Sequence, residues 1–471
     1  GRLQTATFNQ GNAGKITAKA RESISITNEE SLITSFALPT IEGAIVGRGG
    51  DIEIATNSFS LNDAAKVISS TLGQKKSGNI LLEANTVNLD RGFLTTQTGS
   101  PTNLGDGGNA GELKINAGTL RIQNGGLISS ETFNSGSGGK LEANATEFIE
   151  VNGISPITRR NSAITTATSG TANAGDMEIT TPRLLVKNSG NISGETLSSN
   201  GRGGTLNLNT AELILQDNAK VTVSSQGGGD AGYINLSSAS TLLENQSAIA
   251  ADTASGNGGN INLLFSDLIL MRGGSEISTS AGIASAPGDG GNITIDTDFL
   301  VALLDNNDIK ANSFGGRGGA IDITTQRDFG LEVRNQITSL NDITAYSQFS
   351  PEFDGEISLN TPNVDPSQGL VELPQTIIDP DALVAQNPCT QRAGSEFIVT
   401  GRGGLPFNPT QVLSGNDIEI NLIEPANSAN LSDNLGNSSS VNQSSILNST
   451  EIVPAKGCVI NEQVEVILSK S

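Results

Sequence analysis

Residues 201–228 read GRGGTLNLNTAELILQDNAKVTVSSQGG. Two pairs of aliphatic residues alternate with polar residues, and a third apolar position follows: Leu206 and Leu208, Leu213 and Leu215, and Val221. Alternation at every second position indicates a strand with one buried face. The stretch therefore predicts three short strands joined by bends.

The same phrase recurs along most of the chain, and the last glycine of each phrase serves as an anchor. The anchors are Gly14, Gly50, Gly78, Gly111, Gly139, Gly175, Gly204, Gly232, Gly259, Gly291, Gly319 and Gly355. They recur about every 28 residues, and some units are longer by four to eight. The segments between strands are too brief for crossover helices, so equivalent strands must stack coil on coil to bury their apolar faces.

The repeat therefore predicts an all-β fold, a right-handed parallel β-helix (solenoid) of about 12 three-strand coils over residues 1–360. At the corners, glycine provides either a positive φ or room for close backbone approach. The extra residues of the longer units are predicted to form surface loops over a constant core. A calcium-binding nonapeptide roll would need a nine-residue period, which this sequence lacks.

Composition excludes several classes of function. The chain has 27 basic and 49 acidic residues and a formal charge of −22, which disfavours binding to nucleic acid phosphates. It contains no histidine and no tryptophan, so hydrolase sites that need histidine and tryptophan platforms for sugars are excluded. No stretch approaches the roughly 18 consecutive apolar residues of a membrane span.

The repeat weakens after Gly355, and the remainder of the chain divides by composition. Residues 361–425 are punctuated by prolines and are predicted to form a C-terminal cap or irregular extension, because proline cannot donate to a central strand. Residues 426–450 are rich in serine and asparagine and are predicted to be a linker. Residues 451–471 alternate again and are predicted to form short terminal strands.

Three motifs in this C-terminal part carry a resemblance to a known family. They are DPSQGLVELP at 365–374, VAQ at 384–386 and FIVTGRGGLPFNP at 397–409. They resemble the C-terminal signature of cyanobacterial filamentous-haemagglutinin-like exoproteins of the S-layer family, and the upstream coils resemble the repeats of that family. The resemblance covers nearly the whole chain. Its C-terminal motifs are specific, whereas many β-helices share such a coil repeat.

This resemblance implies a function, a location and a partner. It implies a secreted structural or adhesive exoprotein at the outer cell surface, exported by two-partner secretion. The partner would be an outer-membrane β-barrel transporter, which recognises an N-terminal secretion domain that these 471 residues do not contain. Surface glycans or other cells are further expected partners. We expect no enzyme activity and no cofactor.

An enzyme remains the alternative, because β-helices also carry polysaccharide lyases. A lyase-type site could hold calcium with carboxylates and use a lysine or arginine as base. The best candidates are Asp296, Asp298, Asp305 and Asp308, with Lys310 close by in sequence. Their other interpretation is an acidic outward face on an acidic protein, and we propose no catalytic residues.

Two further sets of residues have open interpretations. Arg48, Arg202 and Arg317, from repeated Gly-Arg-Gly-Gly phrases, could stack and bind anionic sugars, or could be surface residues at solvent-exposed corners. Cys389 and Cys458 could form a disulfide in an oxidising compartment, although two cysteines alone do not establish the pair. The resemblance leads us to expect an aromatic residue at position 458, which leaves the bridge open.

Overall fold

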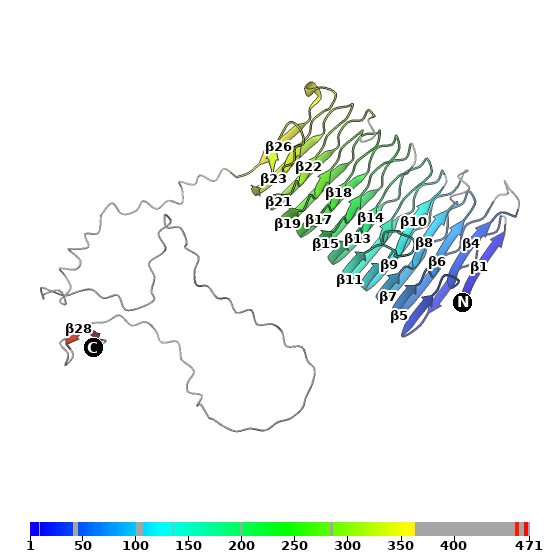
Figure 1. Ribbon diagram of the computed structural model, residues 1–471. Helices are drawn as coiled ribbons and strands as arrows, with labels where there is room; N and C mark the ends of the chain where they lie inside the picture. The colour runs from blue at the N-terminus through cyan, green and yellow to red at the C-terminus, as the bar shows by residue number, and fades with distance from the viewer. Residues whose placement is uncertain are drawn as a thin grey trace. The chain divides into compact units, whose positions relative to one another are not determined.

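The computed structural model describes residues 1–8, 10–40, 46–99, 107–133, 135–197, 200–282, 286–362, 457–460 and 466–469. The chain divides into two compact units, Gly1–Val364 and Asp365–Ser471. The first unit is an all-β solenoid of about 11 turns built from stacked parallel sheets, as the repeat predicts. Figure 1 shows its strands following one another in chain order from β1 to β26.

One sheet of the solenoid contains the longer strands, and we call it the long-strand sheet. Its neighbouring strands pair in parallel, each with the equivalent strand of the next coil. The strands are β2 (Ile16–Lys19), β5 (Ile52–Asn62), β7 (Ile80–Asp90), β9 (Leu113–Gln123), β11 (Leu141–Asn152), β13 (Met177–Lys187), β15 (Thr205–Gln216), β17 (Tyr233–Glu244), β19 (Asn260–Arg272), β21 (Asn292–Ala302), β23 (Ala320–Phe329) and β26 (Glu356–Asn360), with β3 (Ser23–Thr27) pairing with β5.

The other sheet, the short-strand sheet, closes each coil. Its strands are β1 (Arg2–Phe8), β4 (Leu32–Leu38), β6 (Lys66–Thr71), β8 (Phe93–Thr98), β10 (Leu127–Thr132), β12 (Ala163–Thr165), β14 (Asn191–Ser193), β16 (Lys220–Thr222), β18 (Ala248–Ala250), β20 (Glu276–Ser278), β22 (Asp308–Lys310), β25 (Asp342–Thr344) and β24 (Glu332–Val333). A 3-10 helix, η1 (Pro351–Phe353), precedes β26.

From β5 to β21 the coils differ from the prediction in one respect, because their first two expected strands are continuous; in the first coil they are separate, as β2 and β3. In β5 the buried positions are Ile52 and Ile54 and then, after a change of phase, Phe59 and Leu61. Alternation restarts on the opposite parity only if the strand bends between the two pairs. Several neighbouring pairs shift register at this point. The first two apolar pairs are therefore the two arms of one bent strand.

The core consists of aliphatic side chains stacked from coil to coil. Ile52 pairs in register with Ile80, and Ile80 with Leu113, and all three are fully or almost fully buried. Hydroxyl groups line the side of the core next to the glycine turns. There the Ser69 hydroxyl donates to the carbonyl of Gly50 at 2.8 Å, and Thr166 donates to the carbonyl of Gly175 at 2.7 Å. These bonds satisfy buried polar groups where each coil turns.

The anchor glycines are required by close backbone approach and not by a positive φ. From Gly50 to Gly355, a Cβ added at an anchor would lie 1.7 to 2.1 Å from the carbonyl oxygen of the anchor one coil before. None of these anchors is among the glycines with positive φ. The two alternatives left open by the sequence are thereby resolved: the glycine turns stack so closely that no side chain fits between them.

The solenoid ends at β26, close to the predicted boundary at residue 360. In the second unit, β27 (Gly457–Ile460) pairs antiparallel with β28 (Val466–Ser469), within the segment predicted to form short strands. The predicted linker at 426–450 and Cys389 lie outside the described residues, as does all of the predicted cap beyond residue 362. Cys458 lies in β27. Among the described residues, no helix is long and apolar enough to cross a membrane.

Candidate functional site

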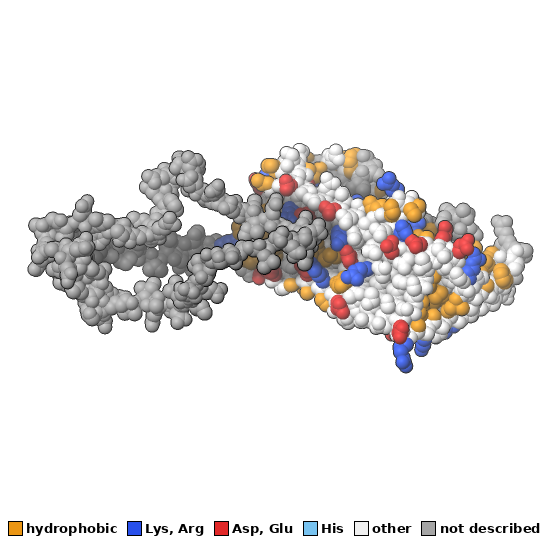
Figure 2. Space-filling model, turned by 60° about the horizontal axis from the view of Figure 1, so that its bottom comes forward, with side chains coloured by type: hydrophobic (Ala, Val, Ile, Leu, Met, Phe, Trp, Pro, Cys, Tyr) orange, Lys and Arg blue, Asp and Glu red, His pale blue; other side chains and the backbone are white. Residues whose placement is uncertain are grey.

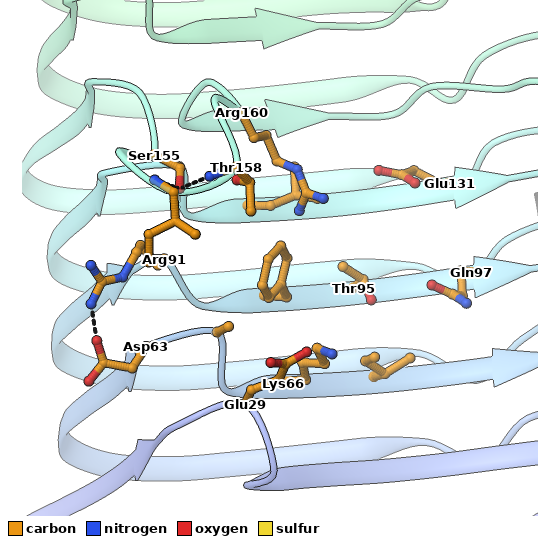
Figure 3. Close-up of a pocket in the computed structure, with 16 residues that line it drawn as sticks. Glu29, Asp63, Lys66, Arg91, Thr95, Gln97, Glu131, Ser155, Thr158 and Arg160 are labelled. Carbon is orange, nitrogen blue, oxygen red and sulfur yellow. Dashed lines mark hydrogen bonds and ion pairs between the residues drawn. The ribbon is translucent and has the colours of Figure 1, made fainter.

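A groove of about 820 Å³ lies over the short-strand sheet at β6, β8 and β10. We call it the β8 groove, because β8 runs along the middle of its floor (Figure 3). Ligand pockets in proteins measure roughly 300–1,000 Å³. The β8 groove therefore has the size of a ligand site.

The floor of the groove follows from the parallel register of three strands. Side chains alternate along β8, so Phe93, Thr95 and Gln97 face outward while Leu94 and Thr96 are buried. Register places Phe93 between Lys66 of β6 and Leu127 of β10, and Gln97 beside Glu131. The floor is thus apolar at the Phe93 end and polar at the Gln97 end.

A loop at residues 153–161 forms one wall of the groove. It belongs to the 36-residue unit between Gly139 and Gly175, and it closes through an antiparallel bridge between Ile154 and Asn161. Ser155 organises the turn: its hydroxyl accepts hydrogen bonds from two loop amides, at 3.3 and 3.1 Å, and its own amide donates to the Arg160 carbonyl at 2.7 Å. The backbone that carries Arg160 is therefore fixed.

Gly125 allows this loop to pack onto the preceding coil. Its φ is +88°, and an added Cβ would lie 2.5 Å from the Ser155 Cβ and 2.9 Å from the Arg160 carbonyl oxygen. Both the conformation and the space require glycine here. The ion pair between Arg91 and Asp63 lies at the same corner of the solenoid, in earlier coils.

Arg160 and Glu131 are two of the charged groups of the groove: Arg160 comes from the loop, and Glu131 belongs to β10 in the floor. The Arg160 guanidinium carbon lies 4.8 Å from the centre of the Phe93 ring, which is a cation–π contact. Burial raises the pKa of the Glu131 carboxyl, while the Ser129 hydroxyl and the Arg160 charge act in the opposite direction. Figure 3 shows Arg160 reaching from the loop over the floor, with Glu131 beyond it.

The calcium candidates are not brought together by the fold. Asp296 and Asp298 lie in β21 of the long-strand sheet, where the Asp298 carboxylate accepts from the Gln326 amide at 2.7 Å. Asp305 lies in the exposed connection, and Asp308 is buried in β22 of the other sheet. Within the part of the chain that the structure describes, no group of three or more acidic, histidine or cysteine side chains could hold a metal ion.

The three candidate arginines each have a partner within the solenoid. Arg48 forms an ion pair with Asp51 at 2.6 Å. Arg202 lies over the Tyr233 ring at 4.2 Å, and Arg317 lies over the Phe353 ring at 5.4 Å. These contacts agree with the interpretation as surface residues at corners of the coil.

Sequence reasoning missed the β8 groove, because its lining comes from five coils. The length of the unit between Gly139 and Gly175 is the available signal, since it predicts a surface loop. Nothing in the sequence indicates which strands that loop would cover. Neither Phe93 nor Glu131 belongs to a recognisable catalytic or binding motif.

Asp252, which follows β18, has a pKa raised to about 6, first by burial and then by the charge of Glu276. Between about pH 4 and pH 6 the folded chain therefore binds more protons than the unfolded chain, so stability falls as pH rises through this window. Asp252→Asn keeps the acceptor for Ser278 and Ser280. We expect it to raise the free energy of unfolding at pH 7.5 by on the order of 1 kcal/mol and to flatten its pH dependence.

Urea unfolding between pH 4 and pH 8 measures this effect. Asp230→Asn is the matched control, because Asp230 is exposed and also accepts a backbone N–H, that of Asn257 at 2.9 Å. An unchanged pH slope in Asp252→Asn, or an equal change in both variants, would contradict the assignment.

Fold and groove together define a β-solenoid with an open groove on its outer face. A scan of protein-family models, a search of curated proteins and a search of solved structures returned no match to the chain.

Proposed function

We propose that this chain is the solenoid part of a secreted structural and adhesive exoprotein at the outer cell surface. The main observation in support of the adhesive role is the β8 groove, a ligand-sized hollow on the outer face of a repetitive scaffold. Export by two-partner secretion, through an outer-membrane β-barrel, rests only on the resemblance of the C-terminal motifs at 365–374 and 397–409.

The surface of the solenoid supports an adhesive role. Figure 2 shows one face on which uncharged polar side chains and backbone predominate, with acidic and basic side chains interspersed. Asparagine side chains form ladders between coils, as where the Asn235 amide donates to Asn207 at 2.9 Å. Such amides and hydroxyls make weak contacts with sugars, and repeated weak contacts add up on a multivalent partner.

A polysaccharide-active enzyme remains the second candidate, and one observation favours it. Burial raises the pKa of the Glu131 carboxyl inside the β8 groove, and a carboxyl with a raised pKa in a cleft is a typical general acid. The acidic residues Asp296 to Asp308 do not support this alternative, because they lie on two different sheets and a connection.

Glycan-array binding by the full 471-residue chain tests the adhesive proposal, with and without calcium. Product release from the same polysaccharides is assayed in parallel. We expect binding without product release, and equal binding in both calcium conditions. Release of any product would replace the proposal with the enzymatic alternative. A chain that neither binds nor cleaves would contradict both and leave a purely structural role.

A further inference from the structure

We propose that the β8 groove binds a saccharide that carries a carboxylate. Arg160 binds the carboxylate, and Thr95 and Gln97 bind sugar hydroxyls. The inference rests on the proposed adhesive function and names the ligand class of that groove. It depends on polar groups in the groove that have no hydrogen-bond or ion-pair partner among the described residues.

Arg160 is positioned for an anion from outside the chain. Its side chain is exposed, and it forms no ion pair with any described residue. Several other arginines of the solenoid pair with carboxylates of neighbouring coils, as Arg183 does with Glu212 at 2.7 Å. The Phe93 ring packs against the guanidinium of Arg160, and the turn at Ser155 fixes the backbone of Arg160. A rigid guanidinium matches a carboxylate with two parallel hydrogen bonds.

Thr95 supplies an independent indication of a ligand. Its side chain lies in the floor and is only 5% exposed, and its hydroxyl has no hydrogen-bond partner among the described residues. A buried hydroxyl without a partner is costly, and most are satisfied by protein, water or ligand. Figure 3 shows Thr95 on the same strand as Gln97, facing the space over which Arg160 reaches. A sugar hydroxyl at this place would complete the bonding of Thr95.

The apolar residues of the lining fit the C–H face of a sugar ring. Phe93 and Leu127 adjoin in the floor, and Ile157 projects from the loop with 76% of its surface exposed. Lys66 lies beside Phe93 in register and adds a second cation at the Arg160 end of the groove. Arg91 and Asp63 in the lining neutralise each other, and the carboxylates Glu29 and Glu131 also line the groove. Lys66 and Arg160 lie at the apolar end of the floor, and their two charges favour an anionic sugar over a neutral one at that end.

Calorimetry on the full chain with two matched tetrasaccharides tests the inference. One is a tetramer of galacturonate, and the other is the corresponding tetramer of galactose, which has a CH2OH group where the first has a carboxylate. We expect the galacturonate tetramer to bind at least about tenfold more tightly, with an affinity that falls as salt rises. We expect Arg160→Gln to abolish this preference, and Thr95→Val to weaken binding about tenfold.

Arg183→Gln is the matched control, because Arg183 lies on the long-strand sheet and does not line the groove. It should leave binding unchanged. Equal affinity for both tetramers, or a preference that survives Arg160→Gln, would overturn the inference while leaving glycan adhesion intact. Binding of neither tetramer would also overturn it. A negative glycan array, in contrast, would remove the proposed function itself. Thermal melting of each variant separates loss of binding from loss of folding.

Discussion

Replacing Gly291 with alanine is expected to destabilise the solenoid by roughly 3–5 kcal/mol, a loss that belongs to the severe end of single substitutions. The added Cβ would lie 1.7 Å from the carbonyl oxygen of Gly259, and the three atoms nearest to it all belong to the backbone. Relief requires the two coils to separate, which breaks the parallel pairing of β19 with β21. Urea unfolding measures the loss, and hydrogen exchange should locate it at these two strands.

Gly14→Ala is the matched control, because Gly14 occupies the same position in the first repeat. No anchor glycine lies before it, and its added Cβ would meet only the side chain of Thr5, at 3.5 Å. We expect its effect to remain within about 0.5 kcal/mol. If the two variants were equally stable, close stacking of the turns could not be the reason for the glycine repeat.

The second large effect is expected at Arg334, in the last coil. Its guanidinium pairs with Asp342, whose side chain is fully buried, and Thr338 also donates to that carboxylate through its amide and hydroxyl. Arg334→Met removes the only cation paired with Asp342 among the described residues and leaves a buried charge. We expect a loss of about 3 kcal/mol at pH 7, measured by urea unfolding.

Two companion variants separate this cause from loss of packing. Glu332 also pairs with Arg334, but it is 70% exposed, so Glu332→Gln should change stability by less than about 0.5 kcal/mol. Adding Asp342→Asn to Arg334→Met removes the uncompensated charge and should restore part of the loss. A double variant no more stable than Arg334→Met would contradict the electrostatic explanation.

The fold could be predicted because its signal is local and repeated. Alternation at Leu206, Leu208, Leu213 and Leu215 specifies which side chains are buried, and a spacing near 28 residues specifies what each strand pairs with. The bend within each long strand could not be separated from a break, because both change the parity of alternation. Only the structure resolves Phe59 as the continuation of the strand that begins at Ile52.

The candidate sites depended on distances through space, which the repeat does not specify. Asp298 and Asp308 are ten positions apart, and the chain turns from one sheet to the other between them. Conversely, Phe93 and Arg160 are far apart in sequence and meet because the loop of a later coil folds back over earlier ones. A loop of known length has no predictable direction, so Arg160 could not be assigned to the groove.

The parallel pairing of every coil with the next also determines how the solenoid responds to tension. Hydrogen bonds between coils run in the stacking direction, so a pull on one end loads the outermost coil first and peels it away before its neighbour. Each detached coil of about 28 residues would release up to about 95 Å of extended chain. A solenoid anchored at a surface would thereby unfold one coil at a time under shear. Each step would absorb mechanical work while the remaining coils stay folded.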